Sequence, residues 1–249
     1  MTRTFTQIVR NRLRHLLGRP TYTAPNEVER EEHRFYLDFL KEGMVVFDVG
    51  ANYGDMTALF SKLVGSTGHI HSFEPVQLTF DRLSEICRWK HLTNATVNRN
   101  AVSQLEGSAT MTLYGDDLAA LNSLCDRPLE LDGITITEKR HEAIETVSID
   151  GYCKRNGIEH IHLLKIDVEG AEYQVFQGAR EMLRRKAISA CIFEFGGATF
   201  DMGNEPSQIE KFLHETGYSV KNVVRGDPVF PGGQSRATAQ FSMQLAVPQ

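Results

Sequence analysis

Residues 164–172, with the sequence LKIDVEGAE, gather one cation and several acids where an apolar run gives way to a helical pattern. Lys165 interrupts that run, and a lysine inside a buried strand needs an anionic partner or a perturbed pKa. Asp167 is the leading candidate for a general base or for orienting a reacting hydroxyl, with Lys165 and Glu169 holding the reactant or tuning that carboxylate. Capping is the alternative, with Asp167 at a helix N-terminus and Glu169 and Glu172 complementing its dipole.

A second polar group follows an earlier apolar run, MVVFDVG at residues 44–50. The loop DVGANYG (48–54) contains the candidate binding residues Asp48, Gly50, Asn52 and Gly54. Its two glycines permit a tight turn and close approach of a ligand, and the helix that follows presents free N–H groups to an anion. The G-x-x-x-G spacing lacks the middle glycine of a pyrophosphate fingerprint, which disfavours a dinucleotide. A tight turn without a ligand is the alternative.

Two further residues complete a candidate nucleoside site. Glu74 ends the next apolar run, in FEP at 73–75, where a carboxylate can accept both hydroxyls of a ribose. Asn100, in NAV at 100–102, is a candidate contact to an adenine or a neighbouring hydroxyl, or else a turn asparagine. A glycine loop with a ribose-binding acid, and without pyrophosphate machinery, fits an adenosine that bears an amino acid, namely S-adenosylmethionine.

The elements that must position these residues alternate between strands and helices from Met44 onward, which predicts a mostly parallel, seven-stranded sheet with helices on both faces. The expected strands are 44–50, 69–73, 95–102, 161–166, 188–195, 218–224 and 240–247, and the expected helices are 55–64, 76–90, 149–156, 171–185 and 206–217. Because no helix separates the last two strands, they should pair antiparallel at the sheet edge. Ligands lie beyond the carboxyl ends of such strands, where every candidate residue falls. By analogy this is the outline of the Rossmann-like class I methyltransferase fold.

Taken together, these motifs resemble the FkbM family of S-adenosylmethionine-dependent methyltransferases. The resemblance rests on DVGANYG, FEP, NAV, LKIDVEGAE and FQGA (176–179), and it covers roughly residues 43–220. It implies a class I methyltransferase fold, with the cofactor held by the loop at 48–54 and by Glu74. It also implies methyl transfer, usually to an oxygen of a sugar, a polyketide or a similar metabolite. Tyr53 occupies a position that is often smaller in the family, and Asn122-Ser123 matches only a loose serine motif.

Two segments lie outside the regular alternation. Residues 103–147 contain short β-like pieces at 110–114 and 134–138, and we interpret them as an insertion that covers the methyl acceptor. Residues 1–42 form a predicted N-terminal helical extension, so that the methyltransferase domain spans 43–249. Within the extension, residues 2–17 predict a basic amphipathic helix, which packs on the body or contacts a membrane surface or a protein partner. A second helix is expected at about 26–40.

The composition bounds the class of protein. The chain has 249 residues, 41% hydrophobic and 24% charged, as in a soluble globular protein with one sizeable domain. No apolar run reaches the roughly 18 residues of a membrane span, and the four cysteines form no CxxC pair, so we expect reduced thiols and a cytoplasmic location. Beyond residue 25 the chain carries 22 basic against 32 acidic residues, which argues against general nucleic-acid binding. The expected partner is a small-molecule or glycan acceptor.

Several alternatives stay open. Asp167, Glu169 and Glu194 have oxygens suited to Mg²⁺, although we predict no metal site. The histidine pairs at 69/71 and 160/162 have H-x-H spacing but begin their strands, at the sheet edge opposite the expected site, so zinc is not expected. A nicotinamide-dependent oxidoreductase is the alternative enzyme. A non-catalytic nucleoside-binding module, recruited through its basic N-terminal helix, is the alternative from another class.

Overall fold

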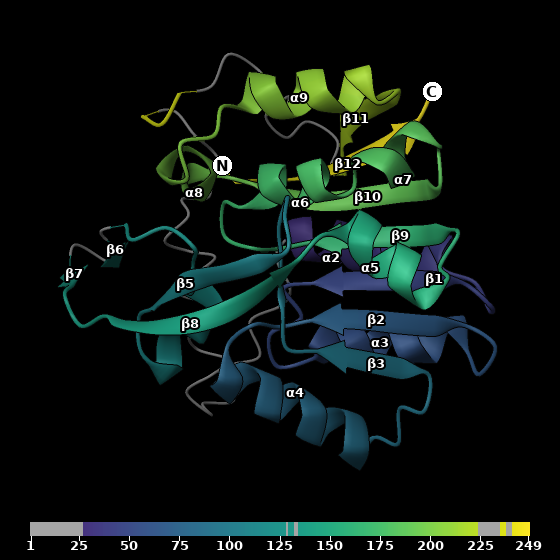
Figure 1. The fold of residues 1–249 in the computed structure, drawn as a ribbon, viewed down its shortest axis with the longest axis horizontal. Helices are drawn as coiled ribbons and strands as arrows, with labels where there is room; N and C mark the ends of the chain where they lie inside the picture. The colour runs from purple at the N-terminus through teal and green to yellow at the C-terminus, as the bar shows by residue number, and fades with distance from the viewer. Residues whose placement is uncertain (1–26, 128, 132–133, 224–234, 238–240) are drawn as a thin grey trace.

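A central sheet of seven strands organises the computed structural model, which describes residues 27–127, 129–131, 134–223, 235–237 and 241–249 (Figure 1). The strand order is β11-β12-β10-β9-β1-β2-β3. The bounds are β1 (Val45–Val49), β2 (His69–Phe73), β3 (Ala95–Asn98), β9 (Ile161–Ile166), β10 (Ile188–Phe195), β11 (Tyr218–Asn222) and β12 (Ser242–Pro248). All neighbours pair parallel except that β12 runs antiparallel to both β10 and β11. The predicted α/β fold and the antiparallel pairing of the last two strands are confirmed.

Helices cover both faces of this sheet. They are α2 (Glu27–Phe39), α3 (Asp55–Val64), α4 (Gln77–Trp89), α5 (Ile149–Asn156), α6 (Glu172–Gly178), α7 (Arg180–Arg184), α8 (Gly197–Asp201) and α9 (Pro206–Glu215). On one face, α5, α6, α7 and α9 bury side chains such as Phe176 against Phe47 and Phe193. On the other, α2 and α3 pack Tyr36 and Phe60 into a second apolar cluster. Two buried faces explain why the central strands are apolar throughout rather than alternating.

Two of the predicted elements are wrong in extent. The expected strand at 95–102 ends at Asn98, and Ala101–Val102 (β4) instead joins a small sheet in the order β4-β8-β5. The expected helix at 171–185 is broken between α6 and α7. Gly178 explains the break, because glycine is a weak helix former and its Cα lies against the carbonyl of Ser103, where a side chain would clash.

As predicted, the segment at 103–147 is an insertion and not another βα unit. It contains β5 (Gly107–Leu113), the short 3₁₀ helix η1 (Asp116–Leu121), β6 (Leu129–Leu131), β7 (Ile134–Ile136) and β8 (Arg140–Val147). The antiparallel ribbon of β5 and β8 extends from the side of the sheet toward which the arrows of β1, β2 and β3 point (Figure 1). It therefore stands at the carboxyl ends of the strands, where ligands bind in such sheets.

The N-terminal part of the chain is described from Glu27 onward. The predicted basic helix at 2–17 lies outside the described residues. From 27 onward, α2 follows the expectation of a second helix, and its Tyr36 is fully buried against the sheet. No helix among the described residues is long and apolar enough to span a bilayer. The division of the chain into an extension at 1–42 and a domain at 43–249 stays a prediction.

Candidate active site

A cleft opens beyond the carboxyl ends of β1, β2 and β9, with a volume of about 570 Å³ including its open mouth. Six residues singled out from the sequence line it: Gly50, Asn52, Glu74, Asn100, Asp167 and Glu169. Three others, Asp48, Gly54 and Lys165, are absent from its lining and lie buried behind it. The sequence pattern therefore predicted that the candidate residues lie together, but it did not distinguish those that face the cleft from those that support it.

The glycines of the loop at 48–54 bring protein segments together. Gly50 has a φ of +78°, and a Cβ there would overlap the carbonyl oxygen of Asp167 at the end of β9. Gly54 has a φ of +89°, and a Cβ there would lie 2.6 Å from Leu83 of α4. Both positions therefore need glycine for a left-handed backbone and for close packing. The close approach that the glycines permit is between the loop and its neighbours in the fold.

Asn52 and Glu74 form the polar part of the cleft wall. Asn52 has a left-handed backbone with φ +48°, and its amide donates to Glu74 Oε2 at 2.9 Å. Glu74 Oε1 accepts from Val76 N at 3.1 Å and from Thr79 Oγ1 at 2.6 Å. Burial raises the pKa of Glu74, and these hydrogen bonds oppose the rise. The carboxylate is thus held in place by the chain itself.

The polar atoms of this wall fit the adenosine expected from the sequence. Asn52 Oδ1 is buried and has no hydrogen-bond partner among the described residues. A buried polar atom without a partner carries a desolvation cost that a donor on a ligand would remove. A carboxylate oxygen can also accept more than one hydrogen bond, so the bond from Asn52 leaves Glu74 Oε2 able to accept a ribose hydroxyl.

Lys165 has the anionic partners that a buried lysine requires. Its Nζ lies 3.4 Å from Asp48 Oδ1, 3.3 Å from Asp167 Oδ2 and 3.3 Å from the carbonyl oxygen of Gly50. Asp48 also accepts from Thr57 Oγ1 at 2.7 Å. Since Asp48 and Lys165 face each other on β1 and β9, the pair ties the first loop to the end of β9. Lys165 acts on the cleft through Asp167 rather than by facing it.

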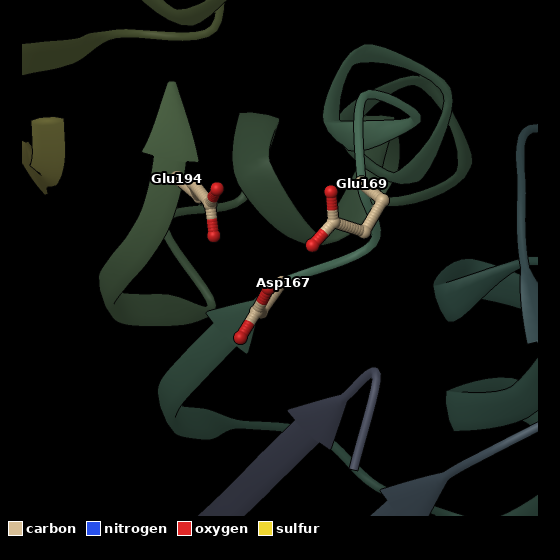
Figure 2. A group of neighbouring side chains, drawn as sticks. All are labelled: Asp167, Glu169 and Glu194. Carbon is tan, nitrogen blue, oxygen red and sulfur yellow. The ribbon is translucent and has the colours of Figure 1, made fainter. Parts of the chain in front are cut away.

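Three carboxylates meet at the ends of β9 and β10. Figure 2 shows Asp167 and Glu169 after β9 and Glu194 on β10, with their side chains directed toward one another. One oxygen from each lies within 4.8 Å of the others, and no other such group of possible metal ligands occurs among the described residues. Glu169 and Glu194 are buried, whereas the Asp167 side chain is 20% exposed. Asp167 is therefore the carboxylate of this group most open to a reactant.

The alternative that Asp167 caps the helix is wrong, although Glu172 does lie in the first turn of α6, where an acid complements the helix dipole. The residue before α6 is Ala171, and no side chain caps the helix. Glu172, 1% exposed, instead accepts from Gly170 N at 3.1 Å and Val168 N at 3.4 Å. Burial raises the pKa of Glu172 to about 7, further increased by Glu169 and Asp167, while backbone hydrogen bonds oppose the rise. Glu172 therefore holds the loop on both sides of Glu169.

Arg127 is a residue that the sequence analysis missed. Its Nη2 lies 3.1 Å from Glu169 Oε2 and its Nη1 lies 3.4 Å from Asp201 Oδ2. Burial alone would lower the pKa of Arg127, but Glu169 and Asp201 raise it above its ordinary value. An arginine 42 residues before its partner, within a polar insertion of no clear periodicity, gives no sequence signal of this contact.

The insertion contributes to the cleft directly, through Met111, Ala119, Ala120, Asn122 and Leu124. The hydroxyl of Tyr53 donates to the carbonyl of Asp116 at 3.3 Å, which links the first loop to η1. Asn100 lines the same wall, and its predicted contact to an adenine stays a prediction. The position of the insertion is consistent with its expected role as a cover.

The histidine pairs have structural partners at the opposite edge of the sheet. His71 Nδ1 lies 2.9 Å from the hydroxyl of Tyr152, and burial together with His69 lowers the pKa of His71 to about 4. His162 Nδ1 accepts from Val45 N at 2.9 Å. Their hydrogen bonds and burial account for these side chains without a metal.

Comparison with known proteins supports the resemblance. The sequence profile described as "Methyltransferase FkbM domain" matches residues 48–220. The chain is 32% identical over 223 residues to 31-O-demethyl-FK506 methyltransferase FkbM of Streptomyces tacrolimicus, covering 80% of this chain and 81% of that protein. It is 25% identical over 195 residues to hexuronic acid methyltransferase AglP of Haloferax volcanii, covering 78% and 71%.

Solved structures agree on the fold. A protein of Streptococcus mutans, assigned as a methyltransferase and solved in complex with SAH, superposes with a TM-score of 0.51 at 9% identity. That alignment covers 91% of this chain and 100% of the other. A protein of Clostridium thermocellum, assigned as an rRNA methylase, gives a TM-score of 0.50 at 11% identity and covers 91% and 98%. At these identities the likeness shows the fold alone.

Proposed function

The chain belongs to the FkbM family of S-adenosylmethionine-dependent methyltransferases, and we propose that it methylates a hydroxyl of a sugar, a glycolipid or a secondary metabolite. One observation carries the proposal. Asn52 and Glu74, which suit a nucleoside, line the same cleft as Asp167, which suits a reacting hydroxyl. One relative is named as a methyltransferase of 31-O-demethyl-FK506 and the other as a methyltransferase of a hexuronic acid, and both names are consistent with an oxygen acceptor.

In this proposal, residues of the first and second strand ends hold the cofactor. Glu74 would accept the ribose hydroxyls, Asn52 Oδ1 would accept from a donor on the nucleoside or its amino acid, and Asn100 would contact the adenine side. Asp48 and Gly54 support this wall from behind, because Asp48 pairs with Lys165 and Gly54 packs on α4. When bound, S-adenosylmethionine would supply a methyl group bonded to a sulfonium sulfur, and attack of an acceptor oxygen on that methyl group would release the sulfur as the thioether of SAH.

Asp167 is the proposed base. It lines the cleft and is partly exposed, so a carboxylate oxygen can accept the proton of an acceptor hydroxyl. Lys165 orients that carboxylate from behind, and Glu169 borders the same space. A positioned base contributes a factor of about 10²–10⁴, whereas orientation of two bound reactants supplies about 7–11 kcal/mol. The larger part of the rate enhancement should therefore come from the shape of the cleft and from exclusion of water by the insertion.

The charges around Asp167 favour an acceptor whose reacting end is uncharged. Lys165 is already shared between Asp48 and Asp167, and Arg127 between Glu169 and Asp201. Neither buried cation is therefore placed to neutralise a carboxylate or phosphate on the acceptor, and like charges at short range cost binding energy. We infer that an acceptor with an acidic group, such as the hexuronic acid for which one relative is named, would have to keep that group away from these carboxylates.

Asp167→Asn tests the assignment. With methyl-labelled cofactor and metabolite or glycan extracts, the wild-type protein should label an acceptor, and the variant should lose at least about 100-fold in turnover. Binding of SAH, measured by calorimetry, should stay within about threefold of wild type. Asp81→Asn, on the outer side of α4, is the control and should behave as wild type. Normal turnover in Asp167→Asn would remove this residue from the mechanism.

A further inference from the structure

Arg127 is a cation of the insertion that is almost fully enclosed. Its side chain is 4% exposed and lies between two acids from separate parts of the chain, Glu169 after β9 and Asp201 at the end of α8. Burying a charged group is costly unless it is paired, and removal of one partner leaves an uncompensated charge. Arg127 and Glu169 therefore depend on each other, whereas Asp201 also pairs with Arg236 at 2.5 Å.

Glu169 receives two contacts from the insertion. Arg127 Nη2 meets its carboxylate at 3.1 Å, and Ser123 Oγ donates to its backbone carbonyl at 3.0 Å. Glu169 also has a φ of +53°, a left-handed backbone that is strained for an L-residue. Such a conformation persists where its surroundings over-determine it. Here the insertion supplies two of the restraints, and Glu172 supplies the third from the helix side.

The segment that makes these contacts also forms a wall of the cleft. Asn122 and Leu124, on either side of Ser123, line the same cleft as Glu74, Asn52 and Glu169. Arg127 itself is absent from the cleft lining, and its guanidinium pairs with its two acids and interacts with Tyr114. One stretch of about six residues thus lines the cleft directly and also contacts Glu169, through Ser123 and Arg127.

We propose that Arg127 is a positioning residue, which fixes Glu169 at the acceptor side of the cleft so that the insertion covering the cofactor also builds the acceptor site. This inference rests on the proposed function, which assigns one part of the cleft to the cofactor and the other to the acceptor. Asp201 completes the arrangement, because it accepts from Arg127 and its backbone carbonyl accepts from Cys125 Sγ at 2.9 Å. The end of α8 is thereby joined to the same insertion segment.

The first test uses hydrogen exchange of the full chain, followed by mass spectrometry of peptides that cover 164–172. In Arg127→Met we expect exchange at 168–171 to rise at least about tenfold, with exchange in β1, β9 and β10 unchanged. Arg127→Lys should fall between this variant and wild type, since it keeps the charge but not the two-sided geometry. Arg140→Met is the matched control, because Arg140 pairs with Asp116 at an exposed position of the same insertion. Unchanged exchange at 168–171, or a rise spread over the whole sheet, would overturn the inference.

The second test separates the two sides of the cleft. SAH affinity of Arg127→Met should stay within about threefold of wild type, while the KM for an acceptor found with labelled cofactor should rise at least about tenfold. Loss of SAH binding in Arg127→Met alone would contradict a role confined to the acceptor side. Should Arg127→Met fail to fold, Arg127→Met/Glu169→Gln removes both charges, and wild-type exchange at 168–171 in that variant would also overturn the proposal. If wild type itself bound no SAH, the proposed function would fail, yet the exchange experiment would still decide whether Arg127 fixes Glu169.

Discussion

Glu74 combines two tasks at the scale of a single residue, because it faces the cleft and also fixes the backbone of Asn52. Glu74→Ala removes a charged acceptor for the ribose and leaves the amide of Asn52 without its partner. Since a hydrogen bond to a charged group is worth about 1.5–3 kcal/mol, SAH affinity should fall at least about tenfold. Calorimetric titration with SAH measures this directly. Glu85→Ala, an exposed acid of α4, should bind as wild type, and an unchanged affinity in Glu74→Ala would place the ribose elsewhere.

Glu172 should make stability depend on pH in the direction opposite to that of an ordinary paired acid. Its folded pKa is raised from 4.5 to about 7, mainly by burial, so the folded protein keeps a proton that the unfolded chain loses between these values. The free energy of unfolding from this group therefore falls as pH rises through that window. Glu172→Gln cannot ionise but keeps an acceptor oxygen for Val168 and Gly170.

We expect Glu172→Gln to lie within about 1 kcal/mol of wild type near pH 5 and to be more stable at pH 8, by up to about 3 kcal/mol. Urea unfolding at both pH values gives the two differences. Glu85→Gln, at an exposed site, should have the same stability as wild type at both pH values. A difference of the same size at pH 5 and pH 8 would mean that the substitution acts through packing and not through the proton.

The carboxylates of Figure 2 should bind Mg²⁺ only weakly. Lys165 already pairs with Asp167, and Arg127 pairs with Glu169, so a divalent cation would have to compete with buried ion pairs. Titration of wild type with MgCl₂ should give a Kd no tighter than about 1 mM, the weak end of calcium-type sites. Arg127→Met, which leaves Glu169 without its guanidinium, should bind the ion more tightly. A micromolar Kd for wild type would instead establish a metal site at this position.

The sequence predicted candidate residues at the strand ends, and six of them line the cleft, but it gave no signal for the contact of Arg127 in the insertion. Asp48 and Lys165 are recognisable because charges inside apolar runs must find each other, and adjacent parallel strands bring their ends together. Arg127 follows no such rule, because its partner is set by how the insertion folds back. Glu172 was visible as an acid near a helix start, but its bonds to the loop behind it depend on the turn at Glu169.

At the scale of elements, Gly50 determines how closely the β1 loop approaches the end of β9. An alanine at this position would combine a φ of +78° with overlap of the Asp167 carbonyl, which is backbone and cannot rotate away. Left-handed strain of about 1–2 kcal/mol plus overpacking of about 1–3 kcal/mol should destabilise Gly50→Ala by roughly 3 kcal/mol. Gly157→Ala isolates the first contribution, because Gly157 has a φ of +65° and open space around it. Equal losses in the two variants, measured by urea unfolding, would show that the overlap is relieved without cost.

The elements themselves were largely predictable, and the exceptions have local causes. Apolar runs such as Ile188–Phe195 mark strands buried on both faces, and Pro206 and Gly217 bracket α9. The strand expected at 95–102 was wrong because β4 pairs with β8, a partner 40 or more residues away that the local pattern does not reveal. The break after α6 was missed because a single glycine is tolerated in a helix, and the sequence does not reveal that Gly178 packs against the carbonyl of Ser103.

At the scale of the whole molecule, the sheet and the insertion divide the work. The strands β1, β2, β9 and β10 bring the polar residues to one edge, and the β5–β8 ribbon stands over that edge (Figure 1). Two contacts from the middle of the insertion connect it to the scaffold, one between Asp116 and Tyr53 and one between Arg127 and Glu169. A ligand in the cleft should therefore stabilise the sheet edge and the insertion together.

Ligand-dependent stability distinguishes the proposed cofactor from a nicotinamide. A ligand at 100 times its Kd that binds only the folded state adds about 2.7 kcal/mol, which for a chain of this size corresponds to roughly 5–10 °C in Tm. SAH should produce this shift, and NADH at the same concentration should not, because the loop at 48–54 lacks the middle glycine for a pyrophosphate. Glu74→Ala should reduce the SAH shift, whereas Glu85→Ala should keep it. A shift with NADH that equals the SAH shift and is likewise reduced in Glu74→Ala would assign the cleft to a dinucleotide, since weak general binding would not depend on Glu74.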